Sequence, residues 1–359
     1  MSSISAGTTT TTGYVVTSDD SGALVLKTGP NNAVAATLDV NQNVLFPGSI
    51  SSVNTFGFKN RIINGAMGIW QRGTSFQPNS VVFGADRFAS YKAGAAAGDY
   101  AQSSDTPSGQ GFTYSAYLNN ADLRHSIELP GAGLPGEYVV GSTWTLSFWV
   151  KGASAGSSTM SIGWSNGVSA STLNNWGGTT PAFNFTTSWT KVTQTFTVTG
   201  TPTGTQPAIL VYISSMGVGS YITGVQLEKG STATSFDYRP YGTELALCQR
   251  YYWQINGASG QMTPISVNWY GTKARPCFPT PVNMRAGPTI ALSGATAGAF
   301  FSTNNDSTYI NFTYLGGFAE VNSNGITTCQ LTLTPDAAGP GGGQLYIQNT
   351  RLLSVSAEL

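Results

Sequence analysis

The feature that most constrains the fold of this chain is a repeated alternation of apolar residues with serine and threonine. It is clearest at residues 145–150, 191–198 and 330–334. A period of two places apolar side chains on one face of a strand and hydroxyl side chains on the other. Turns rich in Gly, Asn and Pro separate these segments. The sequence therefore predicts an all-β protein whose strands have one buried face and one solvated face.

Only one segment has helical character. Residues 243–253 read TELALCQRYYW, in which good helix formers follow a Gly-Thr start. Composition and strand spacing divide the chain into three parts. Residues 1–55 form a short β-rich segment, 56–241 have the size of a two-sheet sandwich, and 242–359 form a C-terminal β domain that opens with the short helix.

Residues 1–55 are rich in Thr, Ser and Asn and contain short β runs at 14–16, 23–26 and 33–36. These runs are too short to enclose a core, so we expect them to pack on the chain's own domains or on other subunits. The first residues lack the basic and apolar stretches of a secretory signal. No window approaches 18 consecutive apolar residues, so no membrane span is predicted.

The charge balance excludes two classes of partner. The chain has 16 Lys and Arg against 16 Asp and Glu, and charged residues make up only 9% of it. Binding to nucleic acid or to an anionic membrane requires clustered cations, which this composition does not supply. We therefore expect neither nucleic-acid binding nor membrane insertion.

Two motifs bracket the middle block. Residues 60–73 read NRIINGAMGIWQRG, followed by ADRF at 85–88, and residues 225–240 read VQLEKGSTATSFDYRP, followed by ELALCQRYY at 244–252. Together they resemble bacteriophage tail-fibre and related virion proteins. The resemblance implies a carbohydrate-binding-module-like jelly roll between the motifs, a homotrimer, and a place on the exterior of a virion, at the tail or the capsid. It also implies that residues 1–55 anchor the protein to other virion proteins.

Jelly rolls of this kind often hold a structural calcium where their ends meet. The resemblance therefore makes Asp86, Gln226 and Glu228 candidate calcium ligands, because their side chains supply oxygen donors. The alternative is that these side chains make ordinary hydrogen bonds at strand ends. No other cofactor is expected.

Catalysis is not predicted. The chain has one histidine, His125, in a segment that alternates like a strand, so a Ser-His or Cys-His pair would depend on that residue alone. The acids Glu128, Glu137 and Asp237 fall in no paired motif of the kind that a glycosidase needs. No nucleophile elbow, phosphate-binding loop or zinc motif occurs. A polysaccharide depolymerase at a subunit interface is the enzymatic alternative.

The aromatic residues suggest where a glycan would bind. Trp164 and Trp176 lie beside Asn and Gly in turn-like sequence, so we predict that these two rings and Asn175 form an exposed sugar site. Trp70, Trp144, Trp149 and Trp189 flank or precede regular strands or belong to the opening motif, and are predicted to pack in the protein. The alternative for Trp164 and Trp176 is packing on a neighbouring subunit.

The predicted helix offers a second surface. Leu245, Cys248 and Tyr252 belong to an apolar stripe that would line a three-fold axis in a trimer, although an interdomain helix fits the stripe equally well. The remaining cysteines, Cys277 and Cys329, are expected to be small buried residues, and a disulfide between them is the alternative.

These observations favour a non-enzymatic bacteriophage virion protein, a trimeric tail fibre or spike that attaches to a host-surface glycan. A capsid-decorating or head-fibre protein is the first alternative, and the depolymerase is the second. The expected partners are other copies of the chain, virion proteins and the host glycan.

Overall fold

A computed structural model describes residues 24–28, 33–38, 44–45, 58–131, 134–168, 173–203, 208–256, 266–270, 273–293, 300–303, 309–322, 325–335, 344–347 and 352–358. The chain divides into two compact units, residues 1–57 and 58–359. The first unit contains an antiparallel sheet in the order β1-β2-β3. Two of its strands coincide with predicted β runs. The third predicted run, at 14–16, lies outside the described residues.

The regular elements within these residues are strands, apart from one α-helix and one turn of 3₁₀ helix at Trp176–Gly178. The elements of the first unit and the sandwich are β1 Leu24–Thr28, β2 Ala33–Leu38, β3 Val44–Leu45, β4 Ser75–Phe76, β5 Val82–Phe83, β6 Phe88–Ser90, β7 Tyr100–Ser103, β8 Ser115–Asn119, β9 Leu123–Glu128, β10 Thr143–Gly152, β11 Gly156–Ser165, β12 Asn174–Asn175, β13 Ala182–Phe185, β14 Thr190–Thr197, β15 Ala208–Ile213 and β16 Gly219–Lys229. The elements that follow are α1 Tyr241–Gln249, β17 Tyr252–Asn256, β18 Ser266–Tyr270, β19 Lys273–Met284, β20 Thr289–Ser293, β21 Phe300–Thr303, β22 Tyr309–Asn322, β23 Gly325–Pro335, β24 Gln344–Ile347 and β25 Leu352–Ser356.

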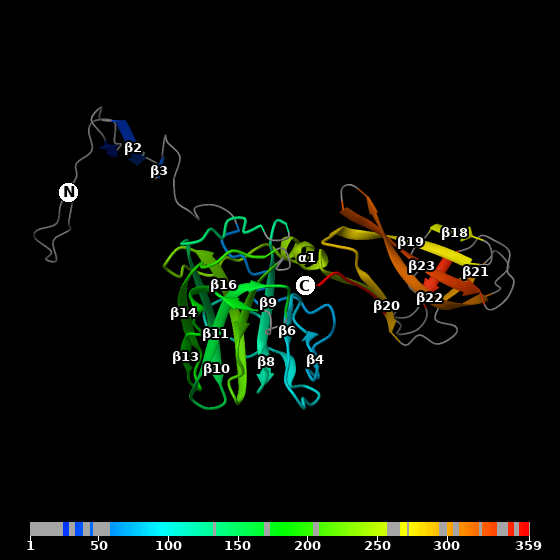
Figure 1. Ribbon diagram of the computed structural model, residues 1–359, viewed down its shortest axis with the longest axis horizontal. Helices are drawn as coiled ribbons and strands as arrows, with labels where there is room; N and C mark the ends of the chain where they lie inside the picture. The colour runs from blue at the N-terminus through cyan, green and yellow to red at the C-terminus, as the bar shows by residue number, and fades with distance from the viewer. Residues whose placement is uncertain are drawn as a thin grey trace, which may run out of the picture. The chain divides into compact units, whose positions relative to one another are not determined.

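Strands β4 to β16 form a sandwich of two antiparallel sheets (Figure 1). One sheet has the order β14-β10-β16-β8-β7-β4, and the other has the order β12-β11-β15-β9-β6-β5 with β13 paired to β11. Each sheet mixes strands from distant parts of the block, which is typical of a jelly-roll-like sandwich rather than a simple meander. The predicted all-β class with one short helix is confirmed.

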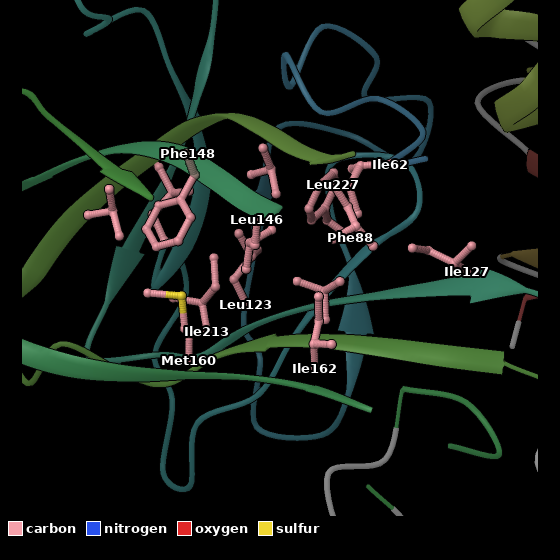
Figure 2. Close-up of a cluster of buried hydrophobic side chains, with 14 of the residues drawn as sticks. Ile62, Phe88, Leu123, Ile127, Leu146, Phe148, Met160, Ile162, Ile213 and Leu227 are labelled. Carbon is pink, nitrogen blue, oxygen red and sulfur yellow. The ribbon is translucent and has the colours of Figure 1, made fainter. Parts of the chain in front are cut away.

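The core lies between these two sheets. Figure 2 shows Leu146, Phe148 and Leu227 from one sheet facing Met160, Ile162 and Ile213 from the other. On β10 the inward residues alternate with Ser147 and Lys151, so the period of two in the sequence places every second residue in the core. Burial of this apolar area is the main stabilising term for the fold, at roughly 25 cal/mol per Å².

The two bracketing motifs meet. The backbone N–H of Arg61 donates to the carbonyl of Leu227 at 2.9 Å, and the Asn60 side chain bonds Val225 and Leu227 of β16 at 3.1 Å each. A Cβ atom on Gly65 would lie 2.0 Å from the carbonyl oxygen of Val225, so only glycine permits this approach. The two ends of the sandwich therefore meet, and this contact explains why the motifs carry Asn and Gly.

Helix α1 begins directly after Pro240 and has Glu244 in its first turn, where a carboxylate interacts favourably with the helix dipole. It ends earlier than predicted. Tyr252 and Trp253 belong instead to β17, which pairs with β25, because aromatic side chains favour an extended, half-covered backbone. No helix in the described part of the chain is long and apolar enough to cross a membrane.

A cluster of charged and aromatic side chains joins the C-terminal end of β25 to the opening motif. Glu358 pairs with Arg72 at 2.9 Å and also with Arg87. The two guanidinium groups stack 3.5 Å from the ring centres of Tyr252 and Tyr251 respectively. We call these five residues the Glu358 cluster. The side chains of Arg87 and Glu358 are only 1% and 7% exposed, so both charges are removed from water.

This cluster corrects the expected trimer stripe. Cys248 and Tyr252 are buried inside their own chain, and the Tyr252 ring is covered by Arg72. Neither can line a three-fold axis, because contacts within the subunit already cover them. Leu245 is half-buried. Cys248 is a buried free thiol, which packs as a small apolar residue. The homotrimer itself stays a prediction.

The C-terminal strands form two further antiparallel sheets, in the orders β17-β25-β20 and β18-β19-β23-β22-β21-β24. In the second sheet Cys277 is opposite Gln330 and Phe278 is opposite Cys329, so the two cysteines are not direct cross-strand partners. Their side chains lie outside the described part, and the disulfide stays a prediction.

Candidate functional site: the outer face of the six-stranded sheet

The predicted sugar site is not exposed. Trp164 and Trp176 are 2% and 1% exposed, and their ring centres lie 5.4 Å apart in an edge-to-face contact. Trp164 follows Met160 and Ile162 at intervals of two on β11, so it points into the core with them. Its Nε1–H donates to the Thr199 carbonyl at 2.9 Å. The expectation that these rings are sugar platforms on turns is wrong.

The third predicted sugar ligand, Asn175, belongs to β12 and is half-buried. Its Oδ1 atom is buried without a hydrogen-bond partner. It lies next to a buried tryptophan rather than an open ring, so the three residues form no accessible stacking surface.

Partly exposed aromatic rings lie instead on the outer face of the sheet that contains β10. Tyr117 on β8 is the cross-strand partner of Tyr221 on β16, and their ring centres are 5.1 Å apart. The ring of Trp189, just before β14, is 6.4 Å from that of Tyr221. All three side chains are half-buried. We call Tyr117, Tyr221 and Trp189 the aromatic row; it crosses the sheet from β8 to the start of β14.

Asp105 holds one end of this row in place. Its carboxylate accepts a hydrogen bond from Trp189 Nε1 at 2.9 Å and one from Lys151 Nζ at 2.5 Å. The Lys151 ammonium lies 5.4 Å from the Tyr221 ring centre. Burial raises the pKa of Asp105, but the hydrogen bonds from Lys151 and Trp189 outweigh it and the pKa is lowered overall. The aspartate is therefore ionised and fixes the indole by an ion-assisted hydrogen bond.

Trp149 lies on the same face, two residues before Lys151 on β10. Its predicted place in the core is wrong, since its side chain is half-buried, whereas Trp144 is fully buried as predicted. Trp149 borders a pocket of about 380 Å³, which we call the Lys191 pocket. Its other lining residues include Gln110, Ser147, Lys191 and the segment 233–236. A ring beside polar side chains in a cavity of this size is typical of a small-molecule site.

The predicted calcium ligands fall into two separate networks. Asp86 accepts from the backbone N–H of Gln71 at 3.0 Å and lies 3.7 Å from the guanidinium of Arg72. Gln226 donates to Glu228 at 2.8 Å, and its own Oε1 accepts from Asp237 N–H, which fixes the amide with its NH₂ group toward the carboxylate. The Gln226 NH₂ group thus occupies the Glu228 oxygen that a calcium ion would need. Because Asp86 also belongs to a separate network, these three residues do not fit a shared calcium site. Among the described residues no group of three or more His, Cys, Asp or Glu is placed to hold a metal.

The acids considered for catalysis each have a structural partner. Glu128 pairs with Arg250 at 3.0 Å and accepts from the Tyr251 hydroxyl at 2.9 Å. Glu137 pairs with Arg61, and Asp237 accepts from the Asn60 backbone at 3.1 Å. These contacts hold the loops and the sandwich ends together.

His125 is buried in the core of the sandwich. Its ring makes an edge contact with Phe88 at 4.8 Å and its Nε2 contacts the backbone of Ile63. Burial, and secondly the charge of Arg87, lower its pKa well below the ordinary 6.5. The His125 imidazole is therefore neutral in the folded protein. Its role is structural, and it is not a base exposed to substrate.

This buried histidine predicts a loss of stability in acid. Below about pH 6.5 the unfolded chain takes up a proton at His125 that the folded chain does not, so stability falls as the pH falls, by about 1.4 kcal/mol per unit. Urea unfolding of the protein and of His125→Gln between about pH 7.5 and pH 5.5 measures it. The wild type should have the steeper dependence. Equal slopes for the two proteins would contradict the assignment.

Part of the sandwich is similar to known proteins. Residues 138–213, which span β10 to β15, match the family described as "Carbohydrate binding domain". A solved CBM4 structure is similar at 18% identity, covering 47% of this chain and 99% of that one, with a TM-score of 0.29. A putative sugar binding protein from Bacteroides thetaiotaomicron is similar at 16% identity, covering 48% and 100%, with a TM-score of 0.34.

Tailspike protein 4 of bacteriophage CBA120 is similar at 16% identity over 48% of this chain and 22% of that one, with a TM-score of 0.28. No curated protein sequence matches this chain. The residues matched by the family include Trp149, Trp189 and Lys191. Residues 138–213, within the all-β sandwich, are therefore similar to the family of carbohydrate-binding domains.

Proposed function

We propose that this chain is a non-enzymatic glycan-binding protein whose sugar site is the aromatic row with the adjoining Lys191 pocket. The observation that carries the proposal is the row itself: three half-buried rings that lie next to one another on one sheet face, with an ionised aspartate fixing Trp189. Aromatic faces cover the apolar C–H face of a pyranose, while nearby hydroxyl, amide and ammonium groups bond its hydroxyls.

We further propose that the protein belongs to a bacteriophage virion, as a trimeric tail fibre or spike that attaches to a host-surface glycan. The resemblance of the bracketing motifs at 60–73 and 225–240 to those of virion proteins supports this role. The hydrogen bond between these motifs fits a sandwich whose first and last segments pair with each other. Several copies on one particle would multiply weak individual sugar contacts into firm attachment. Residues 1–55 would then connect the module to other virion proteins.

Substitution in the aromatic row tests the binding site. We expect Tyr221→Ala to weaken binding of a glycan identified on an oligosaccharide array by roughly tenfold, about 1.4 kcal/mol, because a stacking surface is lost from the centre of the row. Isothermal titration of the full chain gives the affinity. The control is Tyr241→Ala, which removes an exposed ring outside the row, 67% exposed, and should leave the affinity unchanged.

Two results would overturn the site. If Tyr221→Ala and Trp189→Ala both bind like the wild type, then the row does not contact the sugar. If the full chain retains no oligosaccharide on the array, then glycan binding itself fails as the function. Release of reducing sugar from host envelope polysaccharide would instead establish the depolymerase alternative.

The virion role is tested on particles. A label near the C-terminus should be imaged at the distal tail, and the purified protein should have three times the mass of the chain in solution. A label spread over the head would replace the fibre with a capsid-decorating protein, and a monomer would overturn the trimer.

A further inference from the structure

The geometry points to an acidic sugar as the ligand of the Lys191 pocket. This inference rests on the proposed function, because it concerns what the same sheet face selects. Next to the aromatic row the positive charge of Lys151 is cancelled by Asp105, with which it forms an ion pair. The neighbouring Lys191 pocket has an excess positive charge, which is that of Lys191.

Two ammonium groups converge on Thr234 at this pocket. Lys59 Nζ donates to the Thr234 hydroxyl at 2.6 Å, and Lys191 Nζ donates to the Thr234 carbonyl at 3.1 Å. Lys92 and Lys151 each have an aspartate partner within 2.7 Å. Among the described residues neither Lys59 nor Lys191 has a carboxylate within ion-pair distance of 4.0 Å. These two cations are therefore held beside the pocket by neutral oxygen atoms.

One acid lies beneath them, and its oxygens are already engaged. Glu228 is buried, and it accepts hydrogen bonds from the Thr234 N–H at 2.8 Å, the Thr234 hydroxyl at 2.7 Å and Gln226 at 2.8 Å. The Thr234 hydroxyl connects this carboxylate to Lys59, so the charge of Lys59 offsets that of Glu228. Lys191 remains as an uncompensated cation on the exposed side.

Lys191 is also placed to reach a sugar on Trp149. The two residues are direct cross-strand partners on β14 and β10, on the outer face of the sheet. Directly opposite Cβ atoms are about 5 Å apart, so a lysine can extend along the edge of a ring stacked on its neighbour. Its ammonium has three donors, of which Thr234 takes one. Two donors are left for an anionic group on that sugar.

The whole protein gives no competing explanation for anion binding. Its formal net charge is zero, so it has no general attraction for polyanions, and a preference for acidic glycans has to arise locally. The anionic group can be a carboxylate, as in uronic and sialic acids, or a sulfate. The chemistry that recognises them is the same, and the test separates them.

The test uses oligosaccharides in matched pairs, binding to the full-length chain at low ionic strength. Each uronic-acid oligosaccharide is compared with its methyl ester, each sialylated one with its desialylated form, and each sulfated one with its unsulfated parent. We expect the acidic member of at least one pair to bind about fivefold more tightly, as for a partly exposed ion pair. The preference should shrink as salt is added.

Lys191→Gln should abolish this preference, because it lowers the affinity for the acidic member more than the affinity for the neutral member. Lys92→Gln is the matched control, because it removes one positive charge away from the pocket and should keep the preference. If neutral members bind as well as acidic ones, or if the preference survives in Lys191→Gln, the inference is wrong while the proposed glycan site stands. If no member of any pair binds, the proposed function fails first.

Discussion

Glu358→Ala is expected to lower the free energy of unfolding by about 3–5 kcal/mol, the usual cost of leaving a buried charge without its partner. The substitution removes the carboxylate that pairs with both Arg72 and Arg87. Arg72 retains Asp86 at 3.7 Å, whereas the remaining contacts of Arg87 are the Ser126 carbonyl and the Tyr251 ring. Burial already lowers the pKa of Arg87 to about 10, which reflects how poorly its charge is solvated.

Urea unfolding followed by tryptophan fluorescence measures this effect. The control is Glu137→Gln, which breaks the ion pair with Arg61; the Glu137 side chain is 38% exposed, so the expected loss is at most about 1 kcal/mol. Adding Arg87→Met to Glu358→Ala should restore part of the stability, because the unpaired charge is then gone. Equal stability of Glu358→Ala and Glu137→Gln would show that the Glu358 cluster does not stabilise the fold.

Trp164→Ala is expected to lower the free energy of unfolding by about 3–5 kcal/mol, because it opens a cavity beside Trp176 in a well-packed core. The folded fraction should still bind glycan, since the ring does not reach the surface. Thermal unfolding and glycan titration on the same sample separate the two effects.

Trp189→Ala is the matched variant and should behave in the opposite way. Its ring is half-buried in the aromatic row, so its loss should reduce glycan binding more than stability. If Trp164→Ala kept full stability and lost binding, then the buried position of this ring would be wrong and the site would return to the turns at 163–167 and 173–178.

Whether a tryptophan faces the core or the solvent was better predicted by its position in the alternation of a strand than by the turn-forming residues next to it. On β10, Trp149 has the phase of Ser147 and Lys151 and not that of Leu146 and Phe148, so the period of two predicts that it faces outward. On β11, Trp164 has the phase of Met160 and Ile162, which predicts that it faces inward. Nearby Asn and Gly residues were a weaker guide than this alternation and led to the wrong prediction for Trp164. For Trp149 the wrong prediction came from its place in a regular strand, without regard to the strand's phase.

Other parts of the site depend on tertiary contacts that no local pattern reveals. Trp176 is buried because Trp164 and Tyr138 reach it from β11 and from a loop. Tyr117 and Tyr221 become neighbours only through the pairing of β8 with β16, which are about a hundred residues apart in sequence. The partners of Glu358 are likewise set by the fold. The all-β class and the bracketed sandwich were predictable because alternation and the two motifs are local in sequence.

The hydrogen bond between Arg61 and Leu227 means that the chain enters and leaves the sandwich at the same point. A unit with adjacent ends can be inserted into a surface loop of an unrelated protein without stretching either strand, and the host needs to supply only a short gap. Such a unit is transferable between chains during recombination as one piece, with its sheet faces intact. The same closure would let an engineer place this sandwich within a loop of another scaffold rather than only at a terminus.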